Sequence, residues 1–236
     1  MLLKRKIRQY LTRKLGVPEI PTALERLVKR GFQPQQIFDV GAYQGDFAKL
    51  CLQQFPQAKI ACFEVLEHKI RELHALASEQ PNLCIFSTLL GSTIQENVSF
   101  NQAETASSVL VEKIPQHFPV KSYPMTTIDQ IVDEYYSGKS PEFLKIDVQG
   151  YELEVLKGAE RSLSGMSAIL AEINLIDIHE NVPLLAEIVQ WLDARDWVVY
   201  DICGLSRRPL DQALWQSDFI FVPRHSPWRS DKRWIA

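Results

Sequence analysis

Glycine is scarce in this chain, with 10 among 236 residues, so the position of each glycine is informative. The four cysteines lie far apart and form no CxxC pair, which excludes a disulfide-stapled miniprotein and favours reduced cysteines in a cytosolic protein. No apolar run approaches the ~18 residues that a membrane-spanning helix needs. The first fifteen residues contain no apolar core of a signal peptide. These absences predict a cytoplasmic protein.

The composition is otherwise that of an ordinary globular chain. Apolar residues make up 46% and charged residues 23%, which excludes a disordered tail and a collagen-like fibre. The net charge is −3, yet six of the first fourteen residues are basic and none is acidic. The rest of the chain is therefore acidic, whereas a nucleic-acid enzyme would show a broad basic face. We expect no nucleic-acid partner.

The basic N-terminus predicts a helical arm over residues 1–31. Its apolar residues recur at helical spacing: Leu3, Ile7, Tyr10, Leu11 and Leu15. Such a helix makes weak contact with an anionic membrane surface or a partner protein, or it is a solvated helix packed loosely on the domain. We expect one domain over residues 32–224 and a basic, aromatic tail over residues 225–236.

Strand-like and helix-like apolar patterns alternate along the predicted domain. Runs typical of buried strands occur at residues 37–40, 59–64, 83–91, 143–148, 168–174, 197–202 and 217–223. Helical patterns separate the first six runs, with a further extended pair expected over residues 97–111, and no helix separates the last two runs. Since parallel strands need crossover connections, this order predicts a doubly wound α/β fold. Its seven-stranded sheet is mostly parallel, with an antiparallel C-terminal hairpin.

Glycines and acids mark the ends of the first two predicted strands. Gly41 and Gly45 follow Asp39 and let the backbone turn tightly against a ligand. Glu64 ends the next strand about 20 residues later, where an acid is placed to accept hydrogen bonds from both hydroxyls of a ribose. Ligands of such sheets bind at the carboxyl ends of the strands, so this half of the fold predicts an adenosine-type cofactor.

The residues between these glycines favour a cofactor without phosphate. A dinucleotide loop needs glycine where Tyr43 stands, and Asp46 in the first helical turn would repel a pyrophosphate. The Lys-Ser/Thr pair of an ATP-binding loop is absent. The pattern therefore favours S-adenosylmethionine, although Gly41 and Gly45 are also compatible with plain turns.

Several segments together resemble one known family. They are IFDVGAYQGDFA, CFE, SSVL at Ser107, MTTIDQIV from Met125 and FLKIDVQGYELEVLKGAE from Phe143. This set resembles the FkbM family of S-adenosylmethionine-dependent methyltransferases over residues 36–222. The resemblance implies a class I, Rossmann-like methyltransferase fold and usually O-methylation of a sugar or polyketide hydroxyl. Where that family commonly has Asn, this chain has Tyr43.

The same resemblance assigns the cofactor-binding positions. S-adenosyl-L-methionine is the cofactor that it implies. The residues that it makes cofactor-binding are Asp39, Gly41, Gly45 and Glu64. It also places Leu90 and Gly91, at the end of the third strand, beside the adenine.

Polar residues at the ends of the fourth and fifth strands are the catalytic candidates. A hydroxyl acceptor must lose a proton, which calls for a base within hydrogen-bond reach. Lys145 and Asp147 share one strand face, Glu172 lies on the neighbouring strand, and His179 lies in the loop beyond. We expect all four to converge above the transferred methyl group. The alternatives are that Asp147 caps a helix, that Glu172 pairs with Lys145 and that His179 is solvated.

Four further residues are candidates for contact with the substrate: Tyr151, Glu152, Ser107 and Ser108. The two serines are also compatible with a turn cap. Asp147, Glu172, Asp177 and His179 offer oxygen and nitrogen ligands but no tight metal spacing, so we expect no metal.

The sequence thus predicts a methyltransferase that acts on a hydroxyl of a sugar, glycolipid or natural-product scaffold. An N-methyltransferase of the same fold is a rival, but Asp147-Val148-Gln149-Gly150 lacks the Asn/Asp-Pro-Pro-Tyr pattern of amine acceptors. A second rival is a non-catalytic cofactor-binding or scaffold module of a biosynthetic complex.

Overall fold

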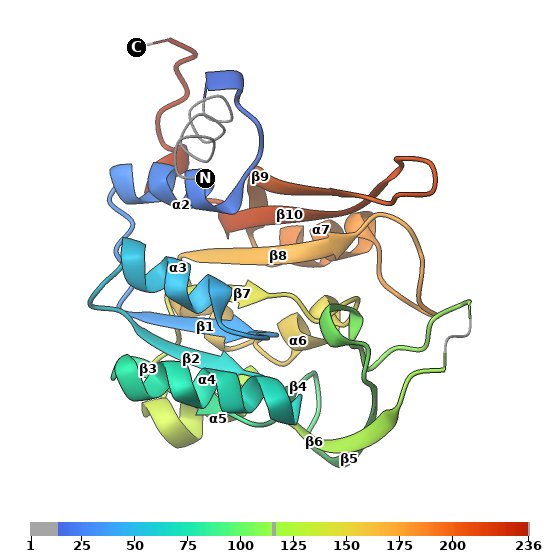
Figure 1. Ribbon diagram of the computed structural model, residues 1–236. Helices are drawn as coiled ribbons and strands as arrows, with labels where there is room; N and C mark the ends of the chain where they lie inside the picture. The colour runs from blue at the N-terminus through green and yellow to red at the C-terminus, as the bar shows by residue number, and fades with distance from the viewer. Residues whose placement is uncertain (1–13, 115–116, 236) are drawn as a thin grey trace, which may run out of the picture.

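A seven-stranded sheet forms the centre of the computed structural model, which describes residues 14–114 and 117–235 (Figure 1). The strand order is β3-β2-β1-β7-β8-β10-β9. The strands are β1 Gln36–Val40, β2 Lys59–Phe63, β3 Leu83–Phe86, β7 Phe143–Ile146, β8 Ala168–Asn174, β9 Trp197–Arg207 and β10 Leu214–Pro223. Neighbouring strands are parallel except β10, which runs antiparallel to both β8 and β9. The predicted seven-stranded α/β sheet with an antiparallel hairpin is confirmed.

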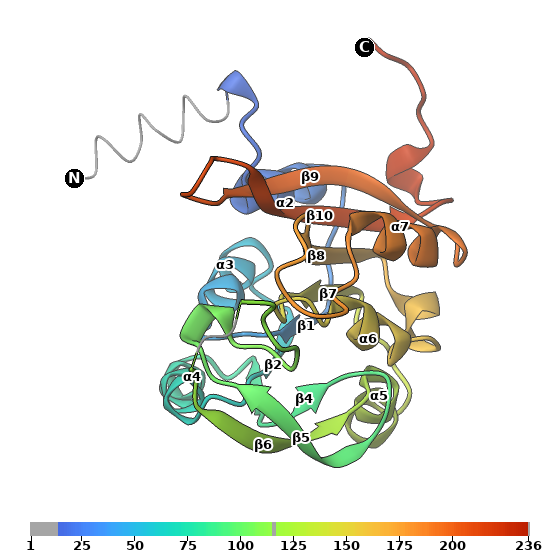
Figure 2. The ribbon, with the colours of Figure 1, turned by 90° about the vertical axis from the view of Figure 1, so that its right-hand side faces the viewer.

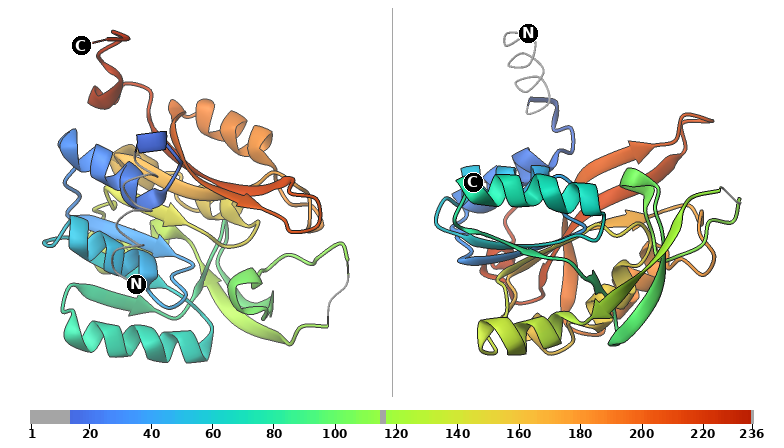
Figure 3. Two further views of the ribbon diagram at one scale, coloured as in Figure 1. Left: turned by 45° about the horizontal axis from the view of Figure 1, so that its top comes forward. Right: turned by 60° about the horizontal axis from the view of Figure 1, so that its bottom comes forward.

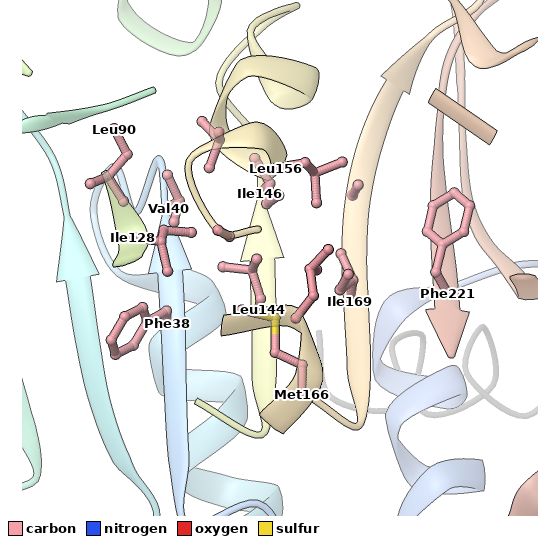
Figure 4. Packing of buried hydrophobic residues seen from close by; sticks show 14 of the residues in the cluster. Phe38, Val40, Leu90, Ile128, Leu144, Ile146, Leu156, Met166, Ile169 and Phe221 are labelled. Atoms are coloured by element: carbon pink, nitrogen blue, oxygen red, sulfur yellow. The ribbon is translucent and has the colours of Figure 1, made fainter. Parts of the chain in front are cut away.

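Helices cover both faces of this sheet. One face carries α2 Ile20–Lys29, α3 Asp46–Gln54 and α4 Glu67–Glu79, and the other carries α5 Ile128–Tyr136, α6 Glu152–Lys157 and α7 Leu185–Asp193. Successive strand side chains point to opposite faces, so Ile37 and Phe38 of β1 join different buried clusters. Figure 4 shows the cluster on the α5–α7 face, where Phe38, Leu144 and Ile169 lie side by side from three strands.

The described part of the predicted N-terminal arm packs against the domain. Ala23, Leu24 and Leu27 of α2 are buried in the same cluster as residues of β1, β2 and β7. Residues 1–13, on which most of the predicted membrane or partner contact falls, lie outside the described residues. In the C-terminal segment the Trp228 ring lies 5.1 Å from the Phe32 ring, centroid to centroid. Over residues 14–114 and 117–235, no helix has the length and apolarity to cross a membrane.

A second, three-stranded sheet corrects two expectations. Its order is β4-β6-β5, with β4 Leu89–Leu90, β5 Gln95–Asn101 and β6 Val120–Thr126. The extended pair expected over residues 97–111 is reduced to a bridge between Asn101 and Ser108, because β5 pairs with β6 and buries Val98 and Phe100. The third predicted strand is likewise split, since Leu89–Leu90 pairs with β6 and not with the large sheet.

The chain between β5 and β6 lies beyond the carboxyl ends of the parallel strands. Its described residues contain a short 3₁₀ helix, Glu104–Ala106, and form bridges from Ser108 to Asn101 and from Glu112 to His179. Figure 2, which faces that edge of the sheet, shows this green segment in front of β1 and β7. Figure 3 shows it projecting from the small sheet. The fold thus places residues 102–114 over the edge where a ligand of a doubly wound sheet binds.

Candidate active site

Two cavities adjoin at the carboxyl ends of β1 and β7. The first cavity extends over β2 and under residues 104–109, and its lining includes Glu64, Leu90, Ser107 and Tyr151. The second cavity extends toward β8 and β10, and its lining includes Lys145, Glu172 and Asp218. Three residues line both cavities: Gly41, Tyr43 and Asp147. A reaction between two ligands therefore has a place here, with one ligand on each side of these residues.

The glycine loop after β1 fits closely against the loop after β7. Gly41 has φ +74°, and a Cβ atom there would lie 1.8 Å from the Asp147 carbonyl oxygen. Gly45 precedes α3 with φ +81°. Both positions lie in the left-handed region that favours glycine, so the turn and the close approach explain both residues.

Glu64 organises the floor of the first cavity. Its Oε1 accepts hydrogen bonds from the Val65 and Leu66 backbone amides at 2.7 and 2.9 Å, and Oε2 accepts one from the Tyr43 amide at 2.9 Å. Burial raises the pKa of this carboxyl above its ordinary value, although the three backbone donors lower it. A carboxylate has about four acceptor sites, so the three amides leave one site, on Oε2, for a hydroxyl of a ligand.

Tyr43 forms part of the wall between the two cavities. Its backbone has φ +48°, a conformation that Asn adopts more readily than Tyr. The phenol donates a hydrogen bond to Glu104 Oε2 at 2.9 Å, and the Lys69 ammonium lies 4.1 Å from the ring centroid. His68 Nε2 lies 3.1 Å from the other Glu104 oxygen. The tyrosine that departs from the family pattern thus joins the glycine loop to the segment over the first cavity.

Lys145 lies between two carboxylates, Asp39 and Asp147, so the alternative that it pairs with Glu172 is wrong. Its Nζ is 3.1 Å from Asp39 Oδ1 and 3.6 Å from Asp147 Oδ2. Strand register is the reason, because Lys145 is the partner of Asp39, whereas Glu172 lies opposite Asp218. Burial lowers the pKa of Lys145, but the Asp39 and Asp147 charges outweigh it and the net pKa is raised.

Asp39 is fully buried and lines neither cavity, so its position differs from that of a residue touching a cofactor. Burial raises its pKa, while the Lys145 ammonium lowers it. Lys145 also donates a hydrogen bond to the Gly41 carbonyl at 2.8 Å. Asp39 therefore acts on the glycine loop through Lys145.

The second cavity carries three neighbouring carboxyl groups. Burial and the charge of Asp147 raise the pKa of Glu172 to about 9, with Asp218 adding to the effect. Burial and Asp147 also raise the pKa of Asp218 to about 6. At neutral pH Glu172 therefore holds a proton and can donate a hydrogen bond.

The structure does not bring His179 to this centre, which corrects the expected convergence. His179 is 2% exposed and lines a third, smaller cavity with Asn101, Ser108 and Glu112. Burial lowers the pKa of the imidazole. The cause is that the loop after β8 pairs with the chain around Glu112 through a bridge between Glu112 and His179.

The substrate candidates fall in different places. Tyr151 and Ser107 line the first cavity, and Ser107 also closes a turn by accepting from the Ala103 amide. Ser108 is buried and donates to the Gln149 carbonyl at 2.8 Å. Glu152 is 1% exposed, lines neither of the two cavities and accepts from backbone amides of the loop before it. Sequence position alone therefore did not separate lining residues from supporting ones.

The end of the small-sheet strand β4 borders the first cavity. Leu90 lines it together with Leu66 and Val109, which gives it an apolar flank. Gly91 does not line it, and a Cβ atom there would lie 2.5 Å from the Met125 sulfur. Close packing, not ligand contact, accounts for that glycine.

Sequence analysis did not identify three residues of the site. Gln149 lines the first cavity, Asp218 lines the second, and Gln216 donates to Gln149 Oε1 at 3.0 Å. Gln149 stands inside the quoted motif, so its position was visible but not its contacts. Asp218 is an acid near the start of the last predicted strand, directly before the apolar run at residues 219–222, and this position was the available signal.

The lining of the first cavity fits S-adenosylmethionine. Among the residues that the structure describes, its lining includes no Lys, Arg or His to pair with a phosphate, but it offers the Glu64 carboxylate beside an apolar flank. Within the described ranges, no three His, Cys, Asp or Glu side chains gather in a way that could hold a metal ion. That no metal is needed stays a prediction.

Comparison with known proteins decides the family. The profile described as "Methyltransferase FkbM domain" matches residues 39–199, more than half of the chain. The chain belongs to the FkbM methyltransferase family. The resemblance of the sequence motifs is confirmed, and with it S-adenosylmethionine as the cofactor.

Solved structures agree on the fold. An FkbM methyltransferase from Methylobacillus flagellatus KT superposes with a TM-score of 0.54 at 16% identity, over 79% of this chain and 43% of that one. This chain therefore spans less than half the length of that protein. A putative O-methyltransferase from Klebsiella pneumoniae gives 0.52 at 10% identity, over 86% and 79% of the two chains. Precorrin-6y C5,15-methyltransferase from Geobacter metallireducens GS-15 gives 0.50 at 13% identity, over 86% of each chain. Comparison with curated proteins gave no sequence match.

Proposed function

We propose that this FkbM methyltransferase transfers a methyl group from S-adenosylmethionine to a hydroxyl of a sugar, glycolipid or natural-product scaffold. The observation that carries the proposal is the meeting of the two cavities at Gly41, Tyr43 and Asp147. The first cavity takes the cofactor, with the ribose at Glu64. The second takes the acceptor, with the Asp147 carboxylate at the junction.

The residues at the junction supply positioning and a proton acceptor. When bound, the cofactor supplies an electrophilic methyl group. Holding two reactants in line removes much of the entropic barrier to their reaction, and this is the main task of the cavity walls. On methylation, the acceptor hydroxyl would lose its proton to an Asp147 oxygen, and the cofactor would leave as S-adenosylhomocysteine with the electron pair on sulfur.

Neighbouring groups assist Asp147 in this scheme. The Lys145 ammonium lies 3.6 Å from Asp147 Oδ2 and helps to hold this side chain at the junction. Protonated Glu172 donates a hydrogen bond to a second oxygen of a polyhydroxylated acceptor. His179 lies in the third cavity, so the scheme does not use it as the base.

Labelled methyl transfer tests the proposal. The protein is incubated with methyl-labelled S-adenosylmethionine and matched acceptor panels, one of hydroxyl compounds and one of amines. We expect transfer to a hydroxyl acceptor, a loss of at least 100-fold in kcat for Asp147→Asn, and no change for Asp133→Asn on the surface of α5. Transfer to amines alone would support the N-methyltransferase, and cofactor binding without transfer to either panel would support the non-catalytic module.

A further inference from the structure

Gln149 lies between the two carboxyl groups of the proposed reaction. It belongs to the loop between β7 and α6 and has φ +54°, a backbone conformation that is uncommon for a residue other than glycine. Such strain persists only where the surroundings hold it, and it is concentrated at functional sites. The contacts of the side chain and of the neighbouring backbone show what holds it.

The Gln149 amide serves both carboxyl groups at once. Nε2 donates to Asp147 Oδ1 at 2.8 Å and to Glu172 Oε2 at 2.7 Å, so each of its two hydrogens has one carboxyl oxygen. Oε1 accepts from Gln216 Nε2 at 3.0 Å. If the amide were flipped, Oε1 would face both carboxyl groups. The NH₂ group would then face the Gln216 side-chain donor, and neither could accept from the other. Gln216 therefore fixes the orientation of the amide.

The backbone of this loop is held from two sides. The Gln149 carbonyl accepts from Ser108 Oγ at 2.8 Å. Glu152 Oε1 accepts from the Val148 and Gly150 amides at 3.1 and 3.0 Å. These contacts account for the buried Ser108 and Glu152 as supports of the loop. They place the side chain of Gln149 without being part of the reaction themselves.

We propose that Gln149 is a positioning residue that keeps Asp147 and Glu172 apart, so that Asp147 Oδ2 is the oxygen available to the acceptor. This inference rests on the proposed function in taking Asp147 as the proton acceptor. Without the amide donor, the carboxylic acid of Glu172 would hydrogen-bond directly to the carboxylate of Asp147. The two carboxyl groups would then share one proton, and Asp147 would lose its capacity to accept another.

The other charged groups that face this pair do not replace the amide. Lys145 approaches Asp147 from β7 at Oδ2, and Asp218 faces Glu172 from β10. Lys145 is already paired with Asp39 at 3.1 Å, and Asp218 adds negative charge. Within the described residues, the amide hydrogens of Gln149 are the hydrogen-bond donors that join the two carboxyl groups.

A double-variant experiment tests the inference. Gln149→Leu has a similar size and no donor, and we expect it to lower kcat roughly 10- to 100-fold, the loss expected for hydrogen bonds to charged groups. The acid limb of its pH–rate profile should move upward by about 1 pH unit or more. Adding Glu172→Gln removes the second acid but keeps a hydrogen-bond donor for the acceptor, so the double variant should be more active than Gln149→Leu and should regain the original profile. Gln130→Leu on α5 is the matched control.

An acceptor-independent measurement separates this inference from the proposed function. Carboxyl carbons of Asp147 and Glu172 are titrated by NMR in the wild type, Gln149→Leu and Gln130→Leu. We expect Gln149→Leu alone to shift the Glu172 titration upward by about 1 pH unit. If Glu172 shows that shift but the wild type transfers no methyl group, the role of Gln149 between the two acids is supported and the proposed function is overturned. Unchanged titrations, or a double variant no more active than Gln149→Leu, would overturn the role of Gln149.

Discussion

Replacement of Glu64 by Ala tests where the ribose of the cofactor binds. The side chain accepts three backbone hydrogen bonds at 2.7 to 2.9 Å in a site where the residue is only 9% exposed. Removing the acceptor leaves three amides without their partner, at about 1 kcal/mol each. The free energy of unfolding should fall by about 2–3 kcal/mol, which lowers the melting temperature of a chain of this size by about 5–10 °C.

Cofactor binding should weaken as well. A hydrogen bond from a ribose hydroxyl to the remaining acceptor site of the carboxylate contributes about 1.5–3 kcal/mol. Its loss should raise the Kd for S-adenosylhomocysteine roughly 10- to 100-fold, measured by calorimetric titration well below the melting temperature. Glu64→Gln keeps one acceptor oxygen, so its loss of binding and of stability should both be smaller.

Glu67→Gln is the matched control for this series. Glu67 is exposed in the first turn of α4, pairs with Lys121 and lines neither cavity. Its substitution removes a charge three residues from Glu64 and should leave the Kd within about twofold of the wild type. A folded Glu64→Ala protein that binds S-adenosylhomocysteine within about threefold of the wild type would refute the assignment of the ribose to Glu64.

Three further predictions concern the loop and the buried charges. Gly41→Ala places a methyl group against the Asp147 carbonyl in a backbone conformation that alanine disfavours, and we expect weaker S-adenosylhomocysteine binding by calorimetry and a melting temperature lower by at least 5 °C. Lys145→Met leaves Asp39 buried without its counter-charge, so the free energy of unfolding, measured with urea, should fall by about 3–5 kcal/mol. Adding Asp39→Asn should recover part of this loss. Equal stability of the single and double variants would contradict the pairing. The pKa of Glu172 is higher in the folded chain than in the unfolded chain, so the folded state binds the proton of this carboxyl more tightly. The stability that this group contributes therefore falls as pH rises from about 4.5 to about 9. Glu172→Gln should flatten the decline in melting temperature across this range, and an unchanged decline would exclude Glu172 as its source.

The large sheet could be predicted because its information is local. Each strand is an apolar run bounded by turns or helices, and the alternation of two periods decides between parallel and antiparallel neighbours. All seven predicted strands occur in the sheet, although the third is shorter than expected because Leu89 and Leu90 pair elsewhere. The error over residues 97–111 has the same origin, since the partner of β5 lies about 20 residues further along the chain at β6.

The cofactor side of the site could also be predicted, because the carboxyl ends of adjacent parallel strands lie at the same edge of the sheet. Gly41 and Glu64 follow β1 and β2, and these two strands are hydrogen-bonded neighbours. Tyr43 was singled out as a departure from the family pattern, but its contact with Glu104 spans 61 positions of sequence and was not predictable. Contacts of that kind depend on how an irregular segment crosses the sheet edge.

The sequence alone determined the fold class, the family and the kind of cofactor, since these depend on apolar periods and on residues fixed at the ends of neighbouring strands. Tertiary structure decided which polar groups work together. Strand register places Lys145 beside Asp39. A bridge between His179 and Glu112 holds His179 in another cavity. The loop after β7 positions the Gln149 amide between Asp147 and Glu172. Side-chain partnership requires atoms to lie within about 3 Å of each other, and only the packed chain brings such distant residues that close.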